Sequence, residues 1–322
     1  MNSIINTVVS FLVSAIGLGM TFLLGATGET IAEKSGHLNL GIPGIMCAGA
    51  ACGCYVEYIY LTLAAGNVNG VLAVLLPVLA TFIGGAAMGF IFSFLTVTLR
   101  ANQNVTGLAI TTLGVGISDY IIKKTGIIYT SGATYFKASL PLADKLGTFG
   151  KIFLSHGVLV YLAIVVAIVT SFIFNRTRVG LHLRSVGENP ATADAAGINV
   201  PRYRYLATCI GCGIASLGGL SFVMDYLNGN WQYIIDDIGW LAIALVIFTV
   251  WKPNLAIFGS IIFGALYIAS SYITGVSFAG KEIFKMLPYV VTIVVLIVTS
   301  MRSRKKNQPP ANLGLNYFRE ER

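Results

Sequence analysis

Charged side chains are scarce in this sequence: only 11% of its 322 residues are Asp, Glu, Lys or Arg. A soluble globular chain carries roughly a quarter of such residues. Here 56% of the residues are hydrophobic and the mean hydropathy is +0.79. Because so little polar surface remains to cover a water-soluble body, the composition predicts an integral membrane protein.

Catalytic and metal-binding motifs are also missing. The sequence has no HExxH pair and no Gly-x-Ser-x-Gly elbow, and its three histidines lie in different regions. Cys209 and Cys212 form a CxxC pair without a second ligand pair, so we interpret them as small buried hydrophobic residues. Residues 275–281 nearly spell a phosphate-binding loop, but Glu282 stands where that loop needs Ser or Thr. An intramembrane enzyme is therefore not indicated, and we expect neither a cofactor nor a metal in this chain.

Long apolar runs divide the chain into candidate membrane spans. A bilayer core about 30 Å thick requires about 20 apolar residues per helix. Suitable runs lie at about 5–25, 40–64, 71–98, 104–122, 156–175, 204–225, 238–250, 255–275 and 284–301. The run at 71–98 is long enough to tilt or to conceal a break, which leaves a tenth segment open. The expected fold is all-α, a polytopic bundle of about nine to ten transmembrane helices.

The distribution of Lys and Arg predicts the orientation. Basic residues gather in residues 176–203 and 302–322, and cytoplasmic segments of membrane proteins carry such an excess. We therefore expect a transmembrane domain over residues 1–301 with a cytoplasmic loop at 176–203, and a short basic cytoplasmic tail over 302–322. The loop at 123–155 then lies outside. The basic residues are not interleaved with exposed aromatic residues, so no nucleic-acid partner is expected.

The loop at 176–203 contains the strongest local signal. Asn189 can cap a helix whose first residue is Pro190, and Gly197 can end it in the left-handed conformation. The pattern predicts a cytoplasmic helix of about two turns. Such a helix is either a plain connector or a docking site for an ATPase. The residues that we assign to ATPase coupling are Glu188, Asn189, Pro190, Ala191, Asp194, Ala195 and Gly197.

Two polar segments interrupt the apolar pattern, at residues 28–44 and 100–107. Each is either a surface turn or a place where irregular backbone lines a solute path. Few ionisable residues lie within the spans, which argues against a proton relay and hence against a secondary transporter. A passive channel would need no coupling loop. The candidate path residues are Asn39, Gly41, Gln103, Asn104 and Thr106.

Several segments resemble a known family. Residues 27–50, TGETIAEKSGHLNLGIPGIMCAGA, are similar to the N-terminal signature of nucleoside and simple-sugar ABC permeases, within the branched-chain amino acid and ribose permease superfamily. Residues 180–200, GLHLRSVGENPATADAAGINV, resemble the cytoplasmic coupling loop of that family. Residues 100–107, Trp251-Lys252-Pro253 and residues 313–317 fit in the same order. Pro43 stands where the signature has an acidic residue, and residues 248–250 replace a more Gly-containing stretch, so both departures bear on substrate choice.

This resemblance implies a type II-like ABC importer permease in a bacterial plasma membrane. Its expected partners are a separate ABC ATPase subunit that uses ATP, a second permease subunit that forms a heterodimer with it, an extracellular substrate-binding lipoprotein and the lipid bilayer. Nucleosides are the first substrate class that it suggests. A pentose or hexose, or a riboflavin-type compound, is the alternative.

Overall fold

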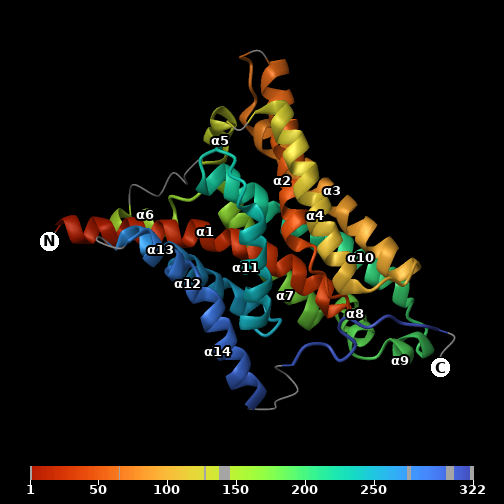
Figure 1. Cartoon of the computed structure of the whole chain (residues 1–322). Coiled ribbons are helices and arrows are strands. Elements are labelled where there is room, and N and C mark those ends of the chain that lie inside the picture. The colour runs from red at the N-terminus through yellow and green to blue at the C-terminus, as the bar shows by residue number, and fades with distance from the viewer. Residues whose placement is uncertain are drawn as a thin grey trace.

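The computed structural model describes residues 2–64, 66–126, 128–137, 146–273, 277–301 and 308–319. These residues form helices joined by short turns (Figure 1). They contain no β-strand, and Ile128 and Asn230 make an isolated bridge. The prediction of an all-α bundle is confirmed.

Seven helices in the described ranges are long and apolar enough to cross a membrane. They are α1 (Asn2–Lys34), α2 (Ile42–Ala64), α3 (Gly70–Ser93) with the π-helical turn η1 (Phe94–Thr98), α4 (Gln103–Thr125), α7 (Val158–Arg176), α10 (Val200–Ser221) with the π-helical turn η2 (Phe222–Tyr226), and α12 (Pro253–Tyr272). Two shorter apolar helices, α11 (Ile235–Phe248) and α14 (Leu287–Met301), coincide with the other two predicted spans. The connecting helices are α5 (Thr130–Phe136), α6 (Gly147–Phe153), α8 (Arg178–Glu188), α9 (Pro190–Ala195) and α13 (Phe278–Lys285).

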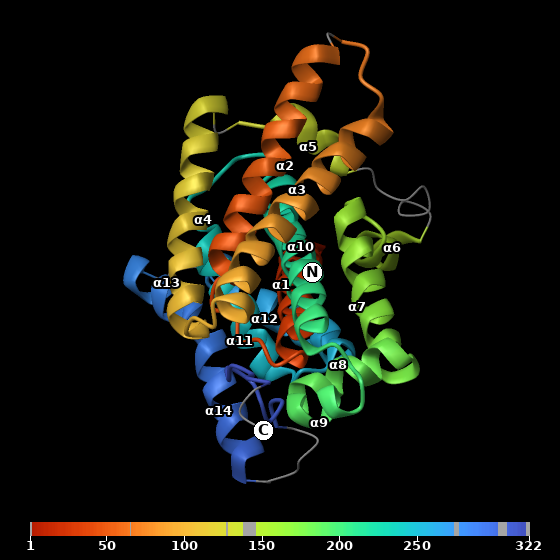
Figure 2. The same ribbon diagram turned by 90° about the vertical axis from the view of Figure 1, so that its right-hand side faces the viewer.

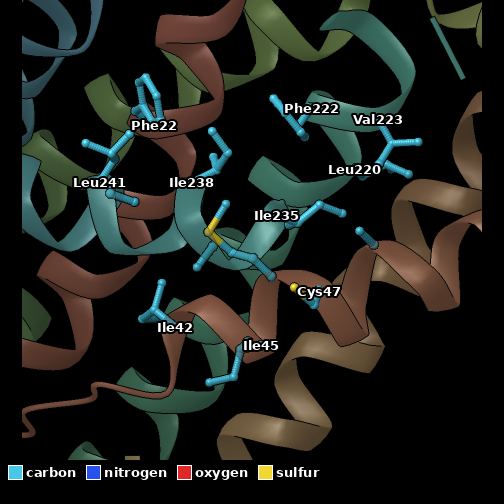
Figure 3. Packing of buried hydrophobic residues seen from close by; sticks show 14 of the residues in the cluster. Phe22, Ile42, Ile45, Cys47, Leu220, Phe222, Val223, Ile235, Ile238 and Leu241 are labelled. Carbon is cyan, nitrogen blue, oxygen red and sulfur yellow. The ribbon is translucent and has the colours of Figure 1, made fainter. Parts of the chain in front are cut away.

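Helices α1 and α10 form the centre of the bundle. α1 runs across the middle of Figure 1 and is seen nearly end-on in Figure 2, with α10 beside it. α10 also packs against α2 and α3, and α1 packs against α12. Figure 3 shows the core that results, in which Phe22 of α1, Ile45 of α2 and Ile238 of α11 belong to one cluster. The outer helices α3, α4 and α7 expose apolar side chains, as helices in contact with lipid do.

The central pair packs through glycine. A Cβ atom on Gly28 of α1 would collide with the backbone of Gly211 in α10, and one on Gly211 would collide with the carbonyl oxygen of Gly28. Two backbones can approach this closely only where neither residue has a side chain. These two glycines therefore set the distance between α1 and α10.

The first span extends further than its sequence indicates. We expected it to end near residue 25, before a polar break at 28–44, but α1 remains helical to Lys34 and only residues 35–41 form a turn. Glu29 and Glu33 lie four residues apart on this helix, both fully or almost fully buried. The indole N–H of Trp251 donates to Glu33 and the backbone N–H of Asn39 donates to Glu29 at 3.1 Å. The helix continues because other elements of the bundle supply partners for these acids.

The bundle has two ends, the tail end and the opposite end. The tail end comprises the turns at 35–41 and 99–102, the loop 177–199 with α8 and α9, the turn at 249–252 and the tail segment, residues 308–319. The opposite end comprises the turn at 66–69, residues 128–137 and residues 227–234. Backbone contacts place the tail segment beside the loop, since the Asn312 N–H donates to the Gly187 carbonyl at 3.0 Å. This agrees with the prediction that the tail and the loop at 176–203 share one side of the membrane.

Candidate coupling site and solute path

The short helix predicted in the loop is present as α9. The Asn189 side chain accepts a hydrogen bond from the Thr192 N–H at 3.0 Å, and Pro190 occupies the first turn. Gly197 has φ +83°, a left-handed conformation in which a residue with a Cβ would be strained. The Ile198 N–H then bonds to the Ala193 carbonyl at 3.0 Å and closes the turn. The local prediction is confirmed in each of these features.

The loop is anchored to the bundle by apolar contacts and close backbone packing. Val186 of α8, Ala193 of α9 and Val200 of α10 form a buried cluster against which Tyr317 packs. A Cβ on Gly187 would collide with the carbonyl oxygen of Lys34 at the end of α1. α8 and α9 are therefore packed against the ends of the two central helices.

The tail segment holds the acidic residues of the loop. The Tyr317 hydroxyl donates to Asp194 at 2.9 Å, and Arg319 forms an ion pair with the same carboxylate at 3.3 Å. The backbone N–H of Ala311 donates to Glu188 at 3.3 Å. Ala191 and Ala195 occupy the exposed side of α9, so the face of the helix that points away from the bundle has small side chains.

The tail segment also contacts both polar turns that we proposed for the path. The Gly314 N–H donates to the Gly36 carbonyl at 3.1 Å. The Asn316 side chain donates to the Arg100 carbonyl at 2.8 Å and accepts from the Gln103 amide at 3.3 Å. One segment therefore joins the loop to the 35–41 turn and to the start of α4.

Buried Arg204 fastens the tail segment to α10. Its guanidinium donates to the Asn312 side chain at 2.8 Å and to the Leu315 carbonyl at 3.3 Å. A cavity of about 380 Å³ lies beside it, and Arg100, Asp194 and Arg319 are among its lining residues. The sequence did not predict that the tail binds Arg204, because residues 313–317 were used only for their resemblance to the permease family. The signal available was the concentration of Asn, Gly and Tyr after the last apolar run.

Three of the candidate path residues meet around the 35–41 turn. Asn39 is fully buried, and its amide donates to the Cys212 sulfur at 3.3 Å while its oxygen accepts from the Gly41 N–H at 2.9 Å. The Gln103 oxygen accepts from the Leu38 N–H at 2.8 Å. Asn39, Gly41 and Gln103 thus shape this turn and hold the start of α4 against it.

The other two candidates lie further along α4. Thr106 is buried, whereas Asn104 is exposed on the surface of the chain. The side chain that caps α4 belongs to Asn102, which accepts from the N–H groups of Asn104 and Val105 at 3.0 and 3.1 Å. The side chain of Asn104 is therefore exposed and does not cap α4.

The turn covers a buried polar cluster that sequence reasoning did not identify. His37 Nδ1 lies 2.9 Å from the Thr208 hydroxyl, and its ring meets Phe92 edge-on. Burial, together with the Arg204 guanidinium, lowers the pKa of His37 well below its usual range, so the ring is neutral. The spacing of the histidines in the sequence does not indicate this cluster, because the residues that contact His37 come from α3 and α10.

The comparison with protein families decides the class of this bundle. Residues 11–296 match the family described as "Branched-chain amino acid transport system / permease component". The chain belongs to this permease family. This bundle is therefore the membrane part of an ABC transporter, and the permease is a multi-pass membrane protein.

Relatives of the permease extend over almost its whole length. It is 32% identical to the guanosine ABC transporter permease protein NupQ of Bacillus subtilis (strain 168), with 93% of each chain covered. It is 28% identical to the nucleoside ABC transporter permease protein NupC of Lactococcus lactis subsp. cremoris (strain MG1363), over 99% of this chain and all of that one. A putative glucose ABC transporter permease protein of Haloferax volcanii, TsgC13, is 29% identical over 92% of this chain and 94% of its own.

Proposed function

We propose that this chain is the permease of an ATP-driven importer for nucleosides. The observation that carries the substrate class is the full-length similarity to NupQ and NupC, which are described as guanosine and nucleoside permeases. The exposed polar residue at the start of α4, Asn104, is uncharged, and a nucleoside needs hydrogen-bonding groups rather than a counter-charge.

ATP would be used by a separate subunit that docks on α9. ATP-driven closure of the ATPase dimer would press on the loop centred on residues 188–197, and the connections to α1, α10 and the tail segment would carry that movement to the turns beside the path. The path would pass Asn104, with Asn39, Gly41, Gln103 and Thr106 shaping its wall. Nothing in this proposal requires chemistry on the solute.

A second permease would complete the path. Ala109, Thr112 and Gly116 lie along the exposed surface of α4 and line a shallow groove there. Small and polar residues on an exposed membrane helix are typical of a surface that packs against another helix. An extracellular binding lipoprotein would deliver the solute, and we propose that the two permeases are different chains.

The tail end faces the cytoplasm in this proposal, as its basic residues predict. Cysteines placed at Tyr135 and Asn228 of the opposite end should react with a membrane-impermeant maleimide added to intact cells, whereas one at Arg184 should not. Labelling of the cysteine at Arg184 from outside would invert the orientation and remove the docking proposal.

The test of substrate class is uptake in cells that lack the native transporter. Expression of this permease with its ATPase and binding protein should give uptake of labelled guanosine that unlabelled nucleosides compete for. Competition by glucose, and not by nucleosides, would instead favour the second candidate, a simple-sugar importer, which the similarity to TsgC13 supports.

A further inference from the structure

A cavity of about 180 Å³ lies between α4 and the start of α11, near the opposite end of the bundle. Ser118 and Asp119 of α4 form one wall, and Trp231, Gln232 and Asp236 form the other. Cys47 of α2 and Ile235 of α11 also line it, and both belong to the packed cluster that Figure 3 shows. Gln232 and Tyr233 are exposed, so the cavity opens at the surface of the chain.

Trp231 carries the strongest indication that a ligand enters this cavity. Its side chain is 4% exposed, and its indole N–H is buried without a hydrogen-bond acceptor among the described residues. Leaving such a donor unpaired costs about 1 to 3 kcal/mol, and most buried donors are paired. A ligand that enters the cavity can supply the missing acceptor.

The charge of the lining restricts what that ligand can be. Asp119 and Asp236 both face the cavity, and its lining contains no Lys, Arg or His. Neither carboxylate forms a salt bridge with a described residue. Two carboxylates repel a phosphate or another anion, but they accept hydrogen bonds from hydroxyl and N–H groups, and charge makes these bonds strong.

The helical repeat connects this cavity with the proposed path. Asn104 and Asp119 are about four turns apart on α4 and so lie on the same side of the helix, about 22 Å from one another along its axis. Val115, which also lines the cavity, is one turn before Asp119 on that side. One side of α4 thus has a polar group near each end of the bundle.

We infer that this cavity is the entry site of the permease for a neutral nucleoside, in which Asp119 and Asp236 accept from ribose hydroxyl or base N–H groups and Trp231 donates to a base acceptor. The inference rests on the proposed function, and it excludes nucleotides because of their phosphate charge. The exposed ring of Tyr233 at the rim offers a surface on which a base can stack.

The first arm of the test is transport. Asp119→Asn, Asp236→Asn and Trp231→Phe should each reduce ATP-dependent inosine uptake by about tenfold, the factor that corresponds to about 1.4 kcal/mol. The neighbouring changes Asp237→Asn and Trp240→Phe, at positions that do not line the cavity, are the matched controls and should keep the normal rate.

Trp231→Phe should also leave the melting temperature of the purified protein unchanged or raised, because it removes an unpaired donor. A fall in both uptake and melting temperature would assign Trp231 a structural role and overturn its part in the site.

The second arm measures the cavity without the binding protein. In membranes that contain the Ser118→Cys permease, maleimide labelling at this position should be slowed by inosine and unaffected by inosine monophosphate or glucose. Equal protection by the monophosphate would contradict the charge argument. If the unaltered transporter takes up neither guanosine nor inosine with ATP, the proposed function fails. If it takes up inosine, but the cavity variants match their controls and inosine gives no protection, only this inference fails.

Discussion

The two ends of the bundle differ in how their buried polar groups are paired. Within the described part of the chain, Glu29, His37 and Arg204 at the tail end each have one atom without a partner, but each also makes at least one hydrogen bond to another element. Towards the opposite end, both carboxyl oxygens of buried Glu57 in α2 and the N–H of Trp231 have no partner among the described residues.

This difference fits the tasks that we propose for the two ends. A unit that transmits force must keep its geometry, and hydrogen bonds between its elements favour this. An end that receives a solute must keep some polar groups available for it. The comparison therefore predicts that changes at the tail end uncouple the transporter, while changes at the opposite end affect how the solute enters.

The largest effect is expected from deletion of residues 308–322. The tail segment joins the loop to two turns and to Arg204, so its loss should reduce ATP-dependent uptake by well over tenfold, which is more than about 1.4 kcal/mol of coupling. Immunoblots of membranes should show normal insertion. Normal uptake by the truncated protein would mean that the tail end does not transmit force.

Reversal of the charge at Asp194 should have a smaller effect, of about tenfold. Asp194→Lys repels Arg319 and removes the acceptor of the Tyr317 hydroxyl, so ATP hydrolysis should continue while uptake falls. Adding Arg319→Glu restores the ion pair in reverse and should recover part of the uptake.

Glu188→Lys and Gly197→Val should also uncouple ATP hydrolysis from uptake, the latter because a β-branched residue is strained at φ +83°. Assembled variants that transport at the normal rate would show that α9 is only a connector.

Much of the structure of the tail end could be predicted from the sequence, because its signals are local. The cap at Asn189, Pro190 in the first turn and the turn at Gly197 all act within a few residues. The anchoring of Asp194 by Tyr317 and Arg319 could not be predicted in the same way, since the partners lie more than a hundred residues away. The extension of α1 to Lys34 was missed for a similar reason, because Trp251 provides the partner for Glu33.

The path residues were predicted as a group, and the structure divides them. Asn39 has backbone and sulfur partners, whereas Asn104 is exposed on α4. A sequence shows that both are polar residues near breaks, but it does not show which one faces the interior. The indole of Trp231 gave no sequence signal, because the absence of a partner is visible only in three dimensions.

Asn39→Leu and Asn104→Leu separate these two positions. Both should reduce uptake by about tenfold. Asn39→Leu should in addition lower the melting temperature, because it leaves the Gly41 N–H without its acceptor. The control Val105→Leu, at the neighbouring exposed residue, should do neither. Normal rates in vesicles that carry either Asn variant would place the path elsewhere, and solute capture by the binding protein should stay the same throughout.

The smallest effect concerns His37 at the tail end. Its pKa in the folded protein is lower than in the unfolded chain, so acid stabilises the unfolded state once the pH falls below the unfolded value of about 6.5. Lowering the pH from about 7.5 to about 5.5 should reduce the free energy of unfolding of the native protein by about 1 kcal/mol more than that of His37→Gln, whose side chain does not titrate. Thermal unfolding in detergent at the two pH values measures this. An identical loss for both proteins would mean that His37 is protonated in the folded state.

We propose that this permease links ATP hydrolysis at its tail end to nucleoside movement through the bundle. The most direct measurement is accumulation of labelled guanosine in proteoliposomes that contain the permeases and the ATPase, with binding protein and guanosine on one side and ATP on the other. With ATP, guanosine should accumulate above the external concentration, and Asp194→Lys should abolish this accumulation while hydrolysis continues. Equal guanosine entry with and without ATP, which stops at the external concentration, would contradict it.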